Sequence, residues 1–479
     1  MTDSENQDLS LQPPQTKQPF LKNLLSLAIP FALQNLIAFA MGFTDNLMVG
    51  QLGDDAISGI YMGNQPQIFL QMVIGGIEGA ILILAAQYWG KNDTSSIRKV
   101  VSIGIKLAGA FGLVVSLVAA TMPYTILTLF TKETGVLREG TEYLRFVGAS
   151  YLFFSITQIL IAAMRSVESA RIGLYISLIG YALDCFLNYI MIFGKLGLPA
   201  MGVKGAAVST LISRTVEMVI VIFYVFKVDK RLRLKLKDLA SFDSILFRDF
   251  IRYGLPVIGG NLVWSINNLA QSAIFGSFNS AGVIAAASIA GSLHSLIYVW
   301  MNGLSSAVGI ITGKMIGAKA SLDAIKKHAR QVQTLFVFVG IFSGLFIFFM
   351  SNRFISLYKI TPEAYGFAKQ FINVISISII GTCYQAACLF GLVKSGGDIS
   401  FVFKMDTFFV FVVVLPSALL AIHLGAPPWV VFACLKCDQI LKCFVAVVKI
   451  NRFNWMKNLT RESSSIENGE AAILDTPAE

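Results

Sequence analysis

Apolar runs of about 20 residues recur along the whole length of this 479-residue sequence. An α-helix of about 20 residues crosses roughly 30 Å of hydrocarbon, so each run is long enough to span a membrane. Since 55% of the residues are hydrophobic and only 14% are charged, lipid is the solvent that suits the chain. Twelve runs are present, with approximate bounds 21–49, 57–86, 101–121, 146–164, 172–193, 205–226, 253–275, 283–311, 332–350, 371–393, 401–420 and 429–448.

The continuity of these runs decides between the two structures that can cross a bilayer. Lipid cannot hydrogen-bond to backbone groups, so a spanning segment is either a helix or a strand of a closed barrel. Barrel strands alternate apolar and polar residues, whereas these runs are apolar throughout. The first 20 residues are polar and carry Asp3, Glu5 and Asp8, which is unlike a cleavable signal peptide, so we expect the first helix to be retained. The sequence predicts an all-α membrane protein with twelve transmembrane helices.

The positive charges indicate an orientation. With both termini in the cytoplasm, most of the Lys and Arg residues fall in cytoplasmic segments, as the positive-inside bias requires. We therefore expect a multi-pass protein of the cell membrane, or of the inner membrane if the source is Gram-negative. The same asymmetry accounts for the net charge of +10 without a nucleic acid partner, and the basic run 231–237 is interpreted as a solvated segment near anionic lipid headgroups. Membrane lipid and a small-molecule substrate are the expected partners of a monomer.

No catalytic constellation is visible. The segment 309–315 lacks the spacing and the terminal Ser or Thr of a phosphate-binding loop. All six cysteines lie in predicted helices, so a disulfide framework is not expected, and Cys434 and Cys437 are interpreted as packing groups despite their CxxC spacing. We expect a protein that is not an enzyme and has no cofactor.

The two halves of the sequence repeat each other. Because each half has an even number of spans, both copies share one orientation, as in transporters built from two parallel lobes around a central cavity. The predicted organisation is a polar cytoplasmic tail (1–20), an N-lobe with helices 1–6 (21–226), a basic cytoplasmic linker (227–250), a C-lobe with helices 7–12 (251–450) and a cytoplasmic tail (451–479). The alignment pairs Pro30 with Pro256, Gly50 with Gly276, Gly76 with Gly303, and Gly90 with Gly317.

Four segments, taken in their order and spacing, resemble a known family. They are 42–50 (GFTDNLMVG), 86–91 (AQYWGK), 184–194 (DCFLNYIMIFG) and 202–210 (GVKGAAVST). They are similar to parts of helices 1, 2, 5 and 6 of the multidrug and toxic compound extrusion (MATE) family, and the resemblance extends over about 21–457. It implies a secondary active antiporter that exports hydrophobic, often cationic, compounds in exchange for Na⁺ or H⁺ by alternating access. Because relatives in the same superfamily flip lipid-linked sugars, a flippase for a lipid-linked or amphipathic substrate is the alternative.

Carboxylates in the middle of membrane helices are candidates for ion coupling, because an unpaired buried charge is costly. The leading candidates are Asp45 and Asp184. Asn188 lies one turn from Asp184 on the same helix face. The resemblance implies coupling by an aspartate on helix 1, an Asn-x-x-x-Asp pair on helix 5 and a threonine on helix 6, which match Asp45 and Thr210. The middle pair is reversed here, Asp184-x-x-x-Asn188, so its charge is displaced by about 6 Å along the helix. We expect Na⁺ or H⁺ at Asp45, Asp184, Asn188 and Thr210.

Structural interpretations remain open for the same acids. Asp45 could cap a helix end near Gly50, and Asp184 could pair with a neighbouring helix. Arg214 and Glu217 are three residues apart on one helix, which favours a structural ion pair. Lys436, Asp438 and Lys442 are interpreted in the same way, near the cytoplasmic part of the last helix.

Polar stripes predict the lining of the cavity. Each stripe alone could reflect hydrogen bonding between helices, but its presence in both halves favours a lined cavity. Asp45 aligns with Gln271, so ion coupling is expected in the N-lobe and not in the C-lobe. The expected lining residues are Gln34, Asn64, Gln67, Gln71, Glu78, Asn261, Trp264, Asn268, Gln271, His294 and Tyr298.

Overall fold

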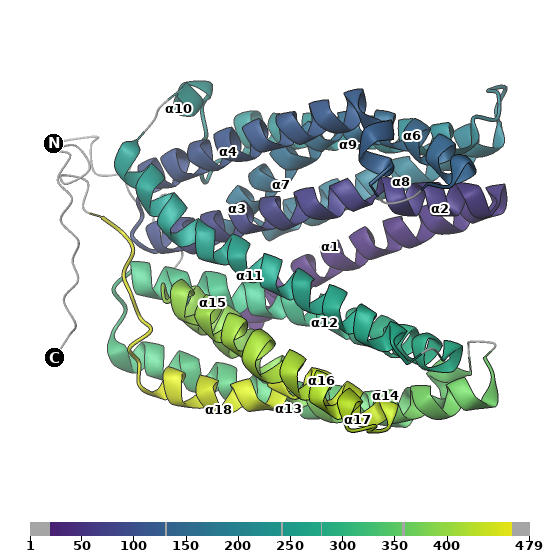
Figure 1. Cartoon of the computed structure of the whole chain (residues 1–479). Helices are drawn as coiled ribbons and strands as arrows, with labels where there is room; N and C mark the ends of the chain where they lie inside the picture. Colours follow the sequence, from purple (N-terminus) through teal and green to yellow (C-terminus); the bar gives the residue numbers. More distant parts are fainter. Residues whose placement is uncertain (1–19, 130–131, 241–242, 279, 357–359, 462–479) are drawn as a thin grey trace, which may run out of the picture.

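The computed structural model describes residues 20–129, 132–240, 243–278, 280–356 and 360–461. Within this part of the chain the fold is helical, and Figure 1 shows two bundles that lie one above the other. The first bundle, or N-lobe, contains α1 (Phe20–Val49), η1 (Gly50–Leu52), α2 (Asp54–Gly63), α3 (Gln65–Gly90), α4 (Thr94–Thr121), α5 (Pro123–Leu127), α6 (Thr134–Ala149), α7 (Tyr151–Ser166), α8 (Ala170–Phe193), α9 (Gly202–Phe223) and η2 (Tyr224–Val228).

A short helix, α10 (Leu236–Ala240), lies between the lobes in the sequence. The C-lobe contains α11 (Ser244–Gly276), α12 (Ala281–Gly317), α13 (Leu322–Ile355), α14 (Pro362–Gln385), η3 (Ala386–Lys394), α15 (Ile399–Phe408), η4 (Phe409–Val414), α16 (Leu415–His423), α17 (Pro428–Lys436) and α18 (Asp438–Asn451).

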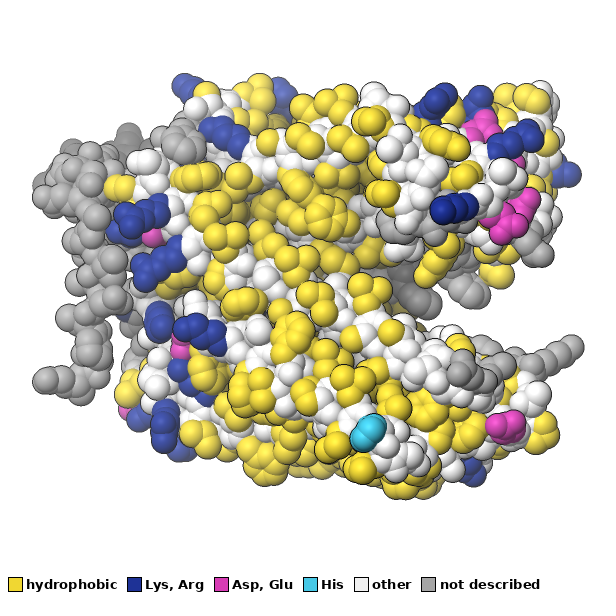
Figure 2. All heavy atoms as spheres, viewed as in Figure 1, with side chains coloured by type: hydrophobic (Ala, Val, Ile, Leu, Met, Phe, Trp, Pro, Cys, Tyr) yellow, Lys and Arg dark blue, Asp and Glu magenta, His cyan; other side chains and the backbone are white. Residues whose placement is uncertain are grey.

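Twelve spans follow from these helices. In the described residues, nine helices are long and apolar enough to cross a membrane, and the bent pair α6 and α7 makes ten. The remaining two spans are α11, which carries several amides, and the broken pair α17 and α18. The predicted all-α membrane fold is confirmed. Figure 2 shows hydrophobic side chains across the middle of one face and many Lys and Arg side chains toward its two ends.

One boundary differs from the sequence prediction. The helix α11 begins at Ser244, inside the segment 227–250 that was expected to be linker. Asp243 caps this start, because its carboxylate accepts hydrogen bonds from the backbone N–H groups of Ile245 (3.1 Å) and Leu246 (3.0 Å). The helix α11 therefore begins before the apolar run 253–275 from which it was predicted.

Glycine contacts between the lobes repeat with the offset of the sequence alignment. Gly76 of α3 lies against Ile258 of α11, and Gly303 of α12 lies against Ala32 of α1. Ala32 and Ile258 occupy equivalent places in the repeat, so the same contact is made once from each lobe. A Cβ atom at either glycine would collide with its neighbour. This reciprocity confirms two pseudo-symmetric six-helix lobes.

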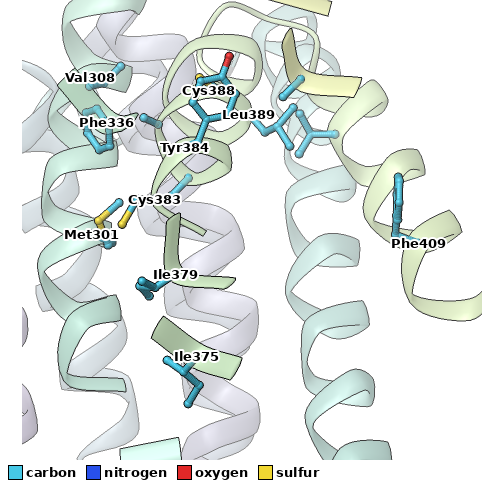
Figure 3. Close-up of a cluster of buried hydrophobic side chains, with 14 of the residues drawn as sticks. Met301, Val308, Phe336, Ile375, Ile379, Cys383, Tyr384, Cys388, Leu389 and Phe409 are labelled. Carbon is cyan, nitrogen blue, oxygen red and sulfur yellow. The ribbon is translucent and has the colours of Figure 1, made fainter. Parts of the chain in front are cut away.

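The first helix of each lobe also packs in the hydrophobic core of the other lobe. Leu24 and Phe31 of α1 belong to a hydrophobic core that is built mainly from the C-lobe. Leu246 and Phe250 of α11 belong to the core of the N-lobe. Figure 3 shows the centre of the C-lobe core, where apolar side chains of α12, α13 and α14 meet. The two lobes are thus joined by exchanged helices as well as by surface contact.

The lobes meet closely at one end of the molecule, the closed end, where α3 and α12 finish. Gly90 lies against the carbonyl oxygen of Lys314, and Gly317 lies against that of Gln87. The Lys314 ammonium also pairs with Glu168 of the N-lobe at 2.8 Å. At the opposite end the lobes are separated by a gap, visible in Figure 2. The structure is therefore open at one end only.

Residues 452–461, here called the strap, run back across the closed end (Figure 1). Trp455 is fully buried in the C-lobe core, and its indole N–H donates to the carbonyl of Ile450 (3.0 Å). The backbone N–H of Lys457 donates to the carbonyl of Gly396 (2.7 Å). These contacts fix the first half of the strap to the C-lobe.

The second half of the strap is fixed to the N-lobe. Gln87 accepts a hydrogen bond from the N–H of Leu459 (2.7 Å) and donates to the carbonyl of Lys457 (3.2 Å). The Arg461 guanidinium binds both oxygens of Asp249, at 2.6 and 2.8 Å, on the first turns of α11, which pack in the N-lobe core. The hydrogen bonds with Asp249 raise the pKa of the Arg461 guanidinium above its ordinary value. Arg461 therefore keeps its positive charge at alkaline pH. The strap therefore links both lobes while the closed end is shut.

Candidate functional site

The helices α1 and α8 bring three of the predicted coupling residues together. Asp184 and Asn188 share one face of α8 because four residues make about one helical turn, and α1 packs along that face. The Asn188 Nδ2 donates to Asp45 Oδ1 at 2.7 Å and to Asp184 Oδ2 at 3.0 Å. One amide nitrogen thus bridges two carboxylates. Asp184 and Asn188 are fully buried, whereas Asp45 is half-buried.

This arrangement leaves oxygen atoms without partners. Asp184 Oδ1 and Asn188 Oδ1 are buried and accept no hydrogen bond from any described residue. No ion pair in the described part of the chain reaches Asp45 or Asp184 either. Arg214 is nearby on α9, but it pairs with Glu217 at 3.0 Å, as the spacing of those residues predicted. One buried carboxylate oxygen and one buried amide oxygen without partners, beside a second carboxylate, suit a proton or a hard cation.

A small cavity of about 70 Å³ lies beside this pair. Because a water molecule occupies roughly 30 Å³ of liquid, the cavity has room for about two waters, or for a cation and a water. Thr210 is at the wall, but its hydroxyl donates to the carbonyl of Ala206 (3.1 Å), so it meets Asp45 across the cavity and not by a direct bond. The lining residues are Gly42, Asp45, Val49, Ile60, Asn64, Tyr143, Ala206 and Thr210.

Fit to a resident ion can be judged from the donor set. Carboxylate, amide and hydroxyl oxygens suit Na⁺, and the two adjacent carboxylates also suit a shared proton. Within the described residues, no three His, Cys, Asp or Glu side chains gather in a metal-binding cluster. The assignment of Na⁺ or H⁺ to this site stays a prediction.

The expected lining residues of the N-lobe have different surroundings. Asn64 ends α2 and accepts a hydrogen bond from Tyr143 (3.1 Å), so it belongs to the cavity beside Asp45. Gln67 is half-buried and Gln71 is exposed on α3. Gln34 and Glu78 instead meet Arg165, an interaction that the sequence stripes did not reveal.

Arg165 of α7 binds two of the expected lining residues at once. Its guanidinium donates to Gln34 at 2.6 Å and lies 3.8 Å from Glu78, while Phe31 covers it at 5.4 Å from the ring centre. The Nε atom of Arg165 is buried and has no partner in the described part of the chain. The carboxylate of Glu78 therefore has an ion-pair partner, unlike those of Asp45 and Asp184.

In the C-lobe, aromatic rings of α11 and α12 form a ladder. Trp264 stacks on Tyr298 with ring centres 6.4 Å apart, and Tyr298 stacks on His294 at 6.0 Å. Asn268 donates to the carbonyl of Trp264 within its own helix (3.1 Å). Asn261 donates to the carbonyl of Met72 in α3 (3.2 Å), so it joins the two lobes.

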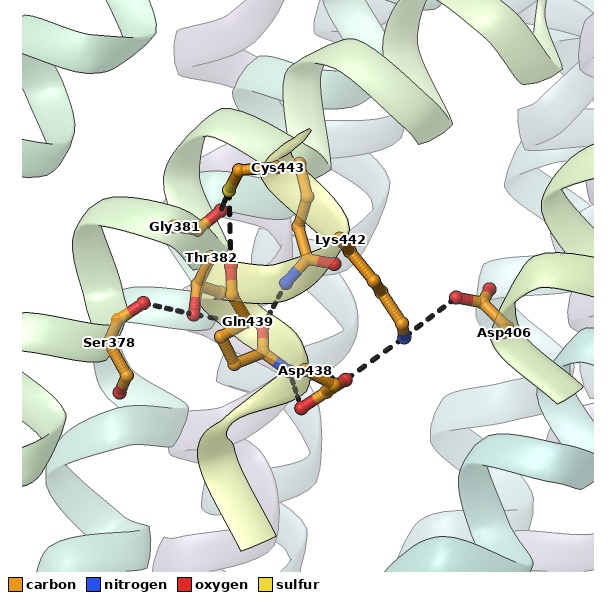
Figure 4. A network of polar contacts seen from close by, with 9 residues as sticks. Ser378, Gly381, Thr382, Asp406, Asp438, Gln439, Lys442 and Cys443 are labelled. Carbon is orange, nitrogen blue, oxygen red and sulfur yellow. Dashed lines mark hydrogen bonds and ion pairs between the residues drawn. The ribbon is translucent and has the colours of Figure 1, made fainter. Parts of the chain in front are cut away.

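The C-lobe also holds an ionic network, shown in Figure 4. The Lys442 ammonium is 2.9 Å from Asp406 and 2.9 Å from Asp438. Gln439 donates to both oxygens of Asp438, at 3.0 and 3.1 Å, and itself accepts from Thr382 (3.0 Å). The helices α17 and α18 meet at Cys437, so this network lies in the middle of the last span. The sequence analysis had placed these residues near the cytoplasmic part of the helix, which is wrong.

Sequence reasoning passed over Asp406, although a lone acid within the apolar run 401–420 was a usable signal. The sequence also gave no indication that Lys436 contacts Gln271. The Lys436 ammonium donates to the Gln271 side-chain oxygen at 3.1 Å. Gln271 was expected to line the cavity as an uncharged amide. The structure instead places the positively charged ammonium of Lys436 against the side-chain oxygen of Gln271.

The comparison with family models decides the family. The model described as MatE matches residues 30–190 and 256–420, once in each lobe, and so covers more than half of the chain. The chain belongs to the MATE family. Its two matches reproduce the duplication that the sequence and the glycine contacts show, and the family confirms a membrane transporter.

Relatives and solved structures agree with this assignment. A probable multidrug resistance protein NorM of Halalkalibacterium halodurans is 25% identical over 411 residues, which cover 86% of this chain and 89% of the relative. A protein of the same description from Thermotoga maritima is 25% identical over 357 residues (74% of this chain, 76% of the relative). A crystal structure of MATE in complex with MaL6 superposes with a TM-score of 0.81 at 17% identity, over 90% of this chain and 96% of that one. At that identity the superposition shows the fold alone.

Proposed function

We propose that this MATE transporter is a multidrug efflux antiporter of the cell membrane, which exports hydrophobic, often cationic, compounds in exchange for Na⁺ or H⁺. The observation that carries the coupling is the pair Asp45 and Asp184, two carboxylates bridged by one Asn188 nitrogen with buried oxygens left unpaired. The names of the NorM relatives support the substrate class.

Charge supports an orientation with the closed end in the cytoplasm. The basic segments 91–99, 319–330 and 449–461 all lie at the closed end. The positive-inside bias places such segments in the cytoplasm. The gap between the lobes then opens to the outside, which is the state that releases substrate and admits the coupling ion.

Ion binding couples to transport through the cost of a buried charge. A proton or Na⁺ at Asp45 and Asp184 neutralises negative charge that is expensive to remove from water. With the charge neutralised, closing the gap over this region costs less free energy, so ion entry shifts the balance between outward-open and inward-open states. Release of the ion on the cytoplasmic side restores the charge and favours return.

Transport in proteoliposomes under separately imposed Na⁺ and pH gradients tests this proposal. Asp45→Asn and Asp184→Asn are each expected to abolish gradient-driven export of ethidium while the protein still folds. Asp55→Asn, which changes an exposed acid of α2, is the matched control and should transport normally. Normal coupling in both Asp45→Asn and Asp184→Asn would refute the assignment and make Glu78 the next carboxylate to test. Translocation of lipid-linked sugar alone would replace export by a flippase function.

A further inference from the structure

A shallow groove of about 580 Å³ lies on the outside of the molecule, beside the first turns of α1 and α8. The groove exists because α1 passes between the lobes. Its first turns pack in the C-lobe core, and its later turns pack on α8 (Figure 1). Both helices begin at the closed end, where the ring of Phe20 meets that of His328, and Glu168, just before α8, pairs with Lys314. The groove is therefore at the closed end and apart from the candidate ion site.

One wall of the groove is an apolar face of α1. Leu21, Leu25 and Ile29 are four residues apart, so they lie one above another on the helix, and they span about 12 Å of its length. Each of these side chains is 38–50% exposed. In a bilayer, such a face takes hydrocarbon as its partner. The groove therefore suits an alkyl chain that lies along α1.

The rim of the groove is basic. Lys22 of α1 and Arg171 of α8 line the same hollow, and both are exposed. No ion pair of the described residues includes either of them. In the proposed orientation, this rim lies at the cytoplasmic leaflet, which carries anionic lipids. Two positive charges beside an apolar wall repel a hydrophobic cation and attract a lipid with a negative headgroup.

We propose that this groove binds one anionic phospholipid, with the phosphate held by Lys22 and Arg171 and an acyl chain along Leu21, Leu25 and Ile29. A guanidinium binds two phosphate oxygens side by side, and the ammonium adds a second positive charge. The ligand is a resident lipid and neither an export substrate nor a coupling ion. The inference therefore goes beyond the proposed function and does not depend on it.

Native mass spectrometry of the full-length protein tests the lipid preference. The protein is released from mixed micelles that contain phosphatidylglycerol and phosphatidylcholine in equal amounts and with the same acyl chains, so that only the headgroups differ. The wild type is expected to retain one phosphatidylglycerol at least about tenfold more tightly than phosphatidylcholine, because two basic residues act on the negative headgroup.

Two variants test the rim and the wall separately. K22Q/R171Q removes both charges and should reduce the preference to less than about threefold. I29W fills the groove but keeps the charges, so retention of phosphatidylglycerol should fall about tenfold. K327Q/R330Q, which removes two exposed basic residues of α13 at the same end, is the matched control and should behave as the wild type. All five side chains are exposed, so every variant should unfold thermally near the wild-type midpoint.

Several outcomes would overturn the lipid site. They are equal retention of the two lipids by the wild type, an undiminished preference in K22Q/R171Q, an equal loss in the control variant, and undiminished retention in the groove-filling variant. Stronger retention in D3N/E5Q/D8N would show that the acidic N-terminal tail occupies the groove in the wild type. Displacement of phosphatidylglycerol by ethidium would show that the groove takes an export substrate. Either of these two results would replace the lipid as the occupant.

Discussion

Replacement of Lys442 by methionine tests the ionic network in the C-lobe. The Lys442 side chain is only 7% exposed, and those of Asp406 and Asp438 are 15% and 5% exposed. Methionine nearly preserves the volume but leaves two buried acids without their shared cation. Asp438 keeps two hydrogen bonds from Gln439, so most of the cost falls on Asp406.

The expected loss is about 3–5 kcal/mol, the usual cost of removing one partner from a buried ion pair. Thermal unfolding of the purified protein in detergent should show a midpoint several degrees below the wild type. The double variant D406N/K442M removes the stranded charge and should recover much of the loss. K369M, which changes an exposed lysine, is expected to stay within about 0.5 kcal/mol of the wild type.

Two results would refute this reasoning. One is a midpoint for K442M that equals that of K369M, which would mean that the ion pair contributes little net stability. The other is a double variant no more stable than K442M, which would mean that the stranded charge of Asp406 is not the origin of the loss.

Three further variants, with a fourth as a control, test the contacts at the closed end. Gly317→Ala places a methyl group against a backbone carbonyl of the other lobe, so it should lower the free energy of unfolding by at least about 2 kcal/mol in a thermal assay. Gly366→Ala is the control, because the space around Gly366 is open; it should be neutral or stabilising by up to about 1 kcal/mol. Trp455→Ala empties a fully buried site and should cost about 3–5 kcal/mol in the same assay. Asp249→Asn removes the charge that Arg461 binds, so the strap should be cleaved faster by trypsin; an unchanged rate would show that this pair does not hold it.

Much of the architecture could be predicted because it depends on local composition. Continuous apolar runs fix helices as the spanning structure, since lipid offers the backbone no hydrogen bonds. The duplicated prolines and glycines fix two parallel lobes. Mid-helix acids are rare enough in such a chain that Asp45 and Asp184 could be selected without a structure. The helix period alone placed Asn188 beside Asp184.

The tertiary structure decided which polar groups already have partners. Glu78 and Gln34 looked like free lining residues, but α7 brings Arg165 to both. Lys436 and Gln271 are far apart in the sequence, and only the packing of α17 near α11 joins them.

The same distinction separates the two lobes. Sequence alone determined where charges lie along each helix and that the C-lobe lacks an acid opposite Asp45. Only the packing determined that Lys442 satisfies Asp406 and Asp438, which leaves Lys436 with an amide, while Asp45 and Asp184 are left with one shared Asn188. The physical reason is that the energy of a buried charge depends on the groups within a few ångströms of it, and in a helical bundle most of those groups come from other helices.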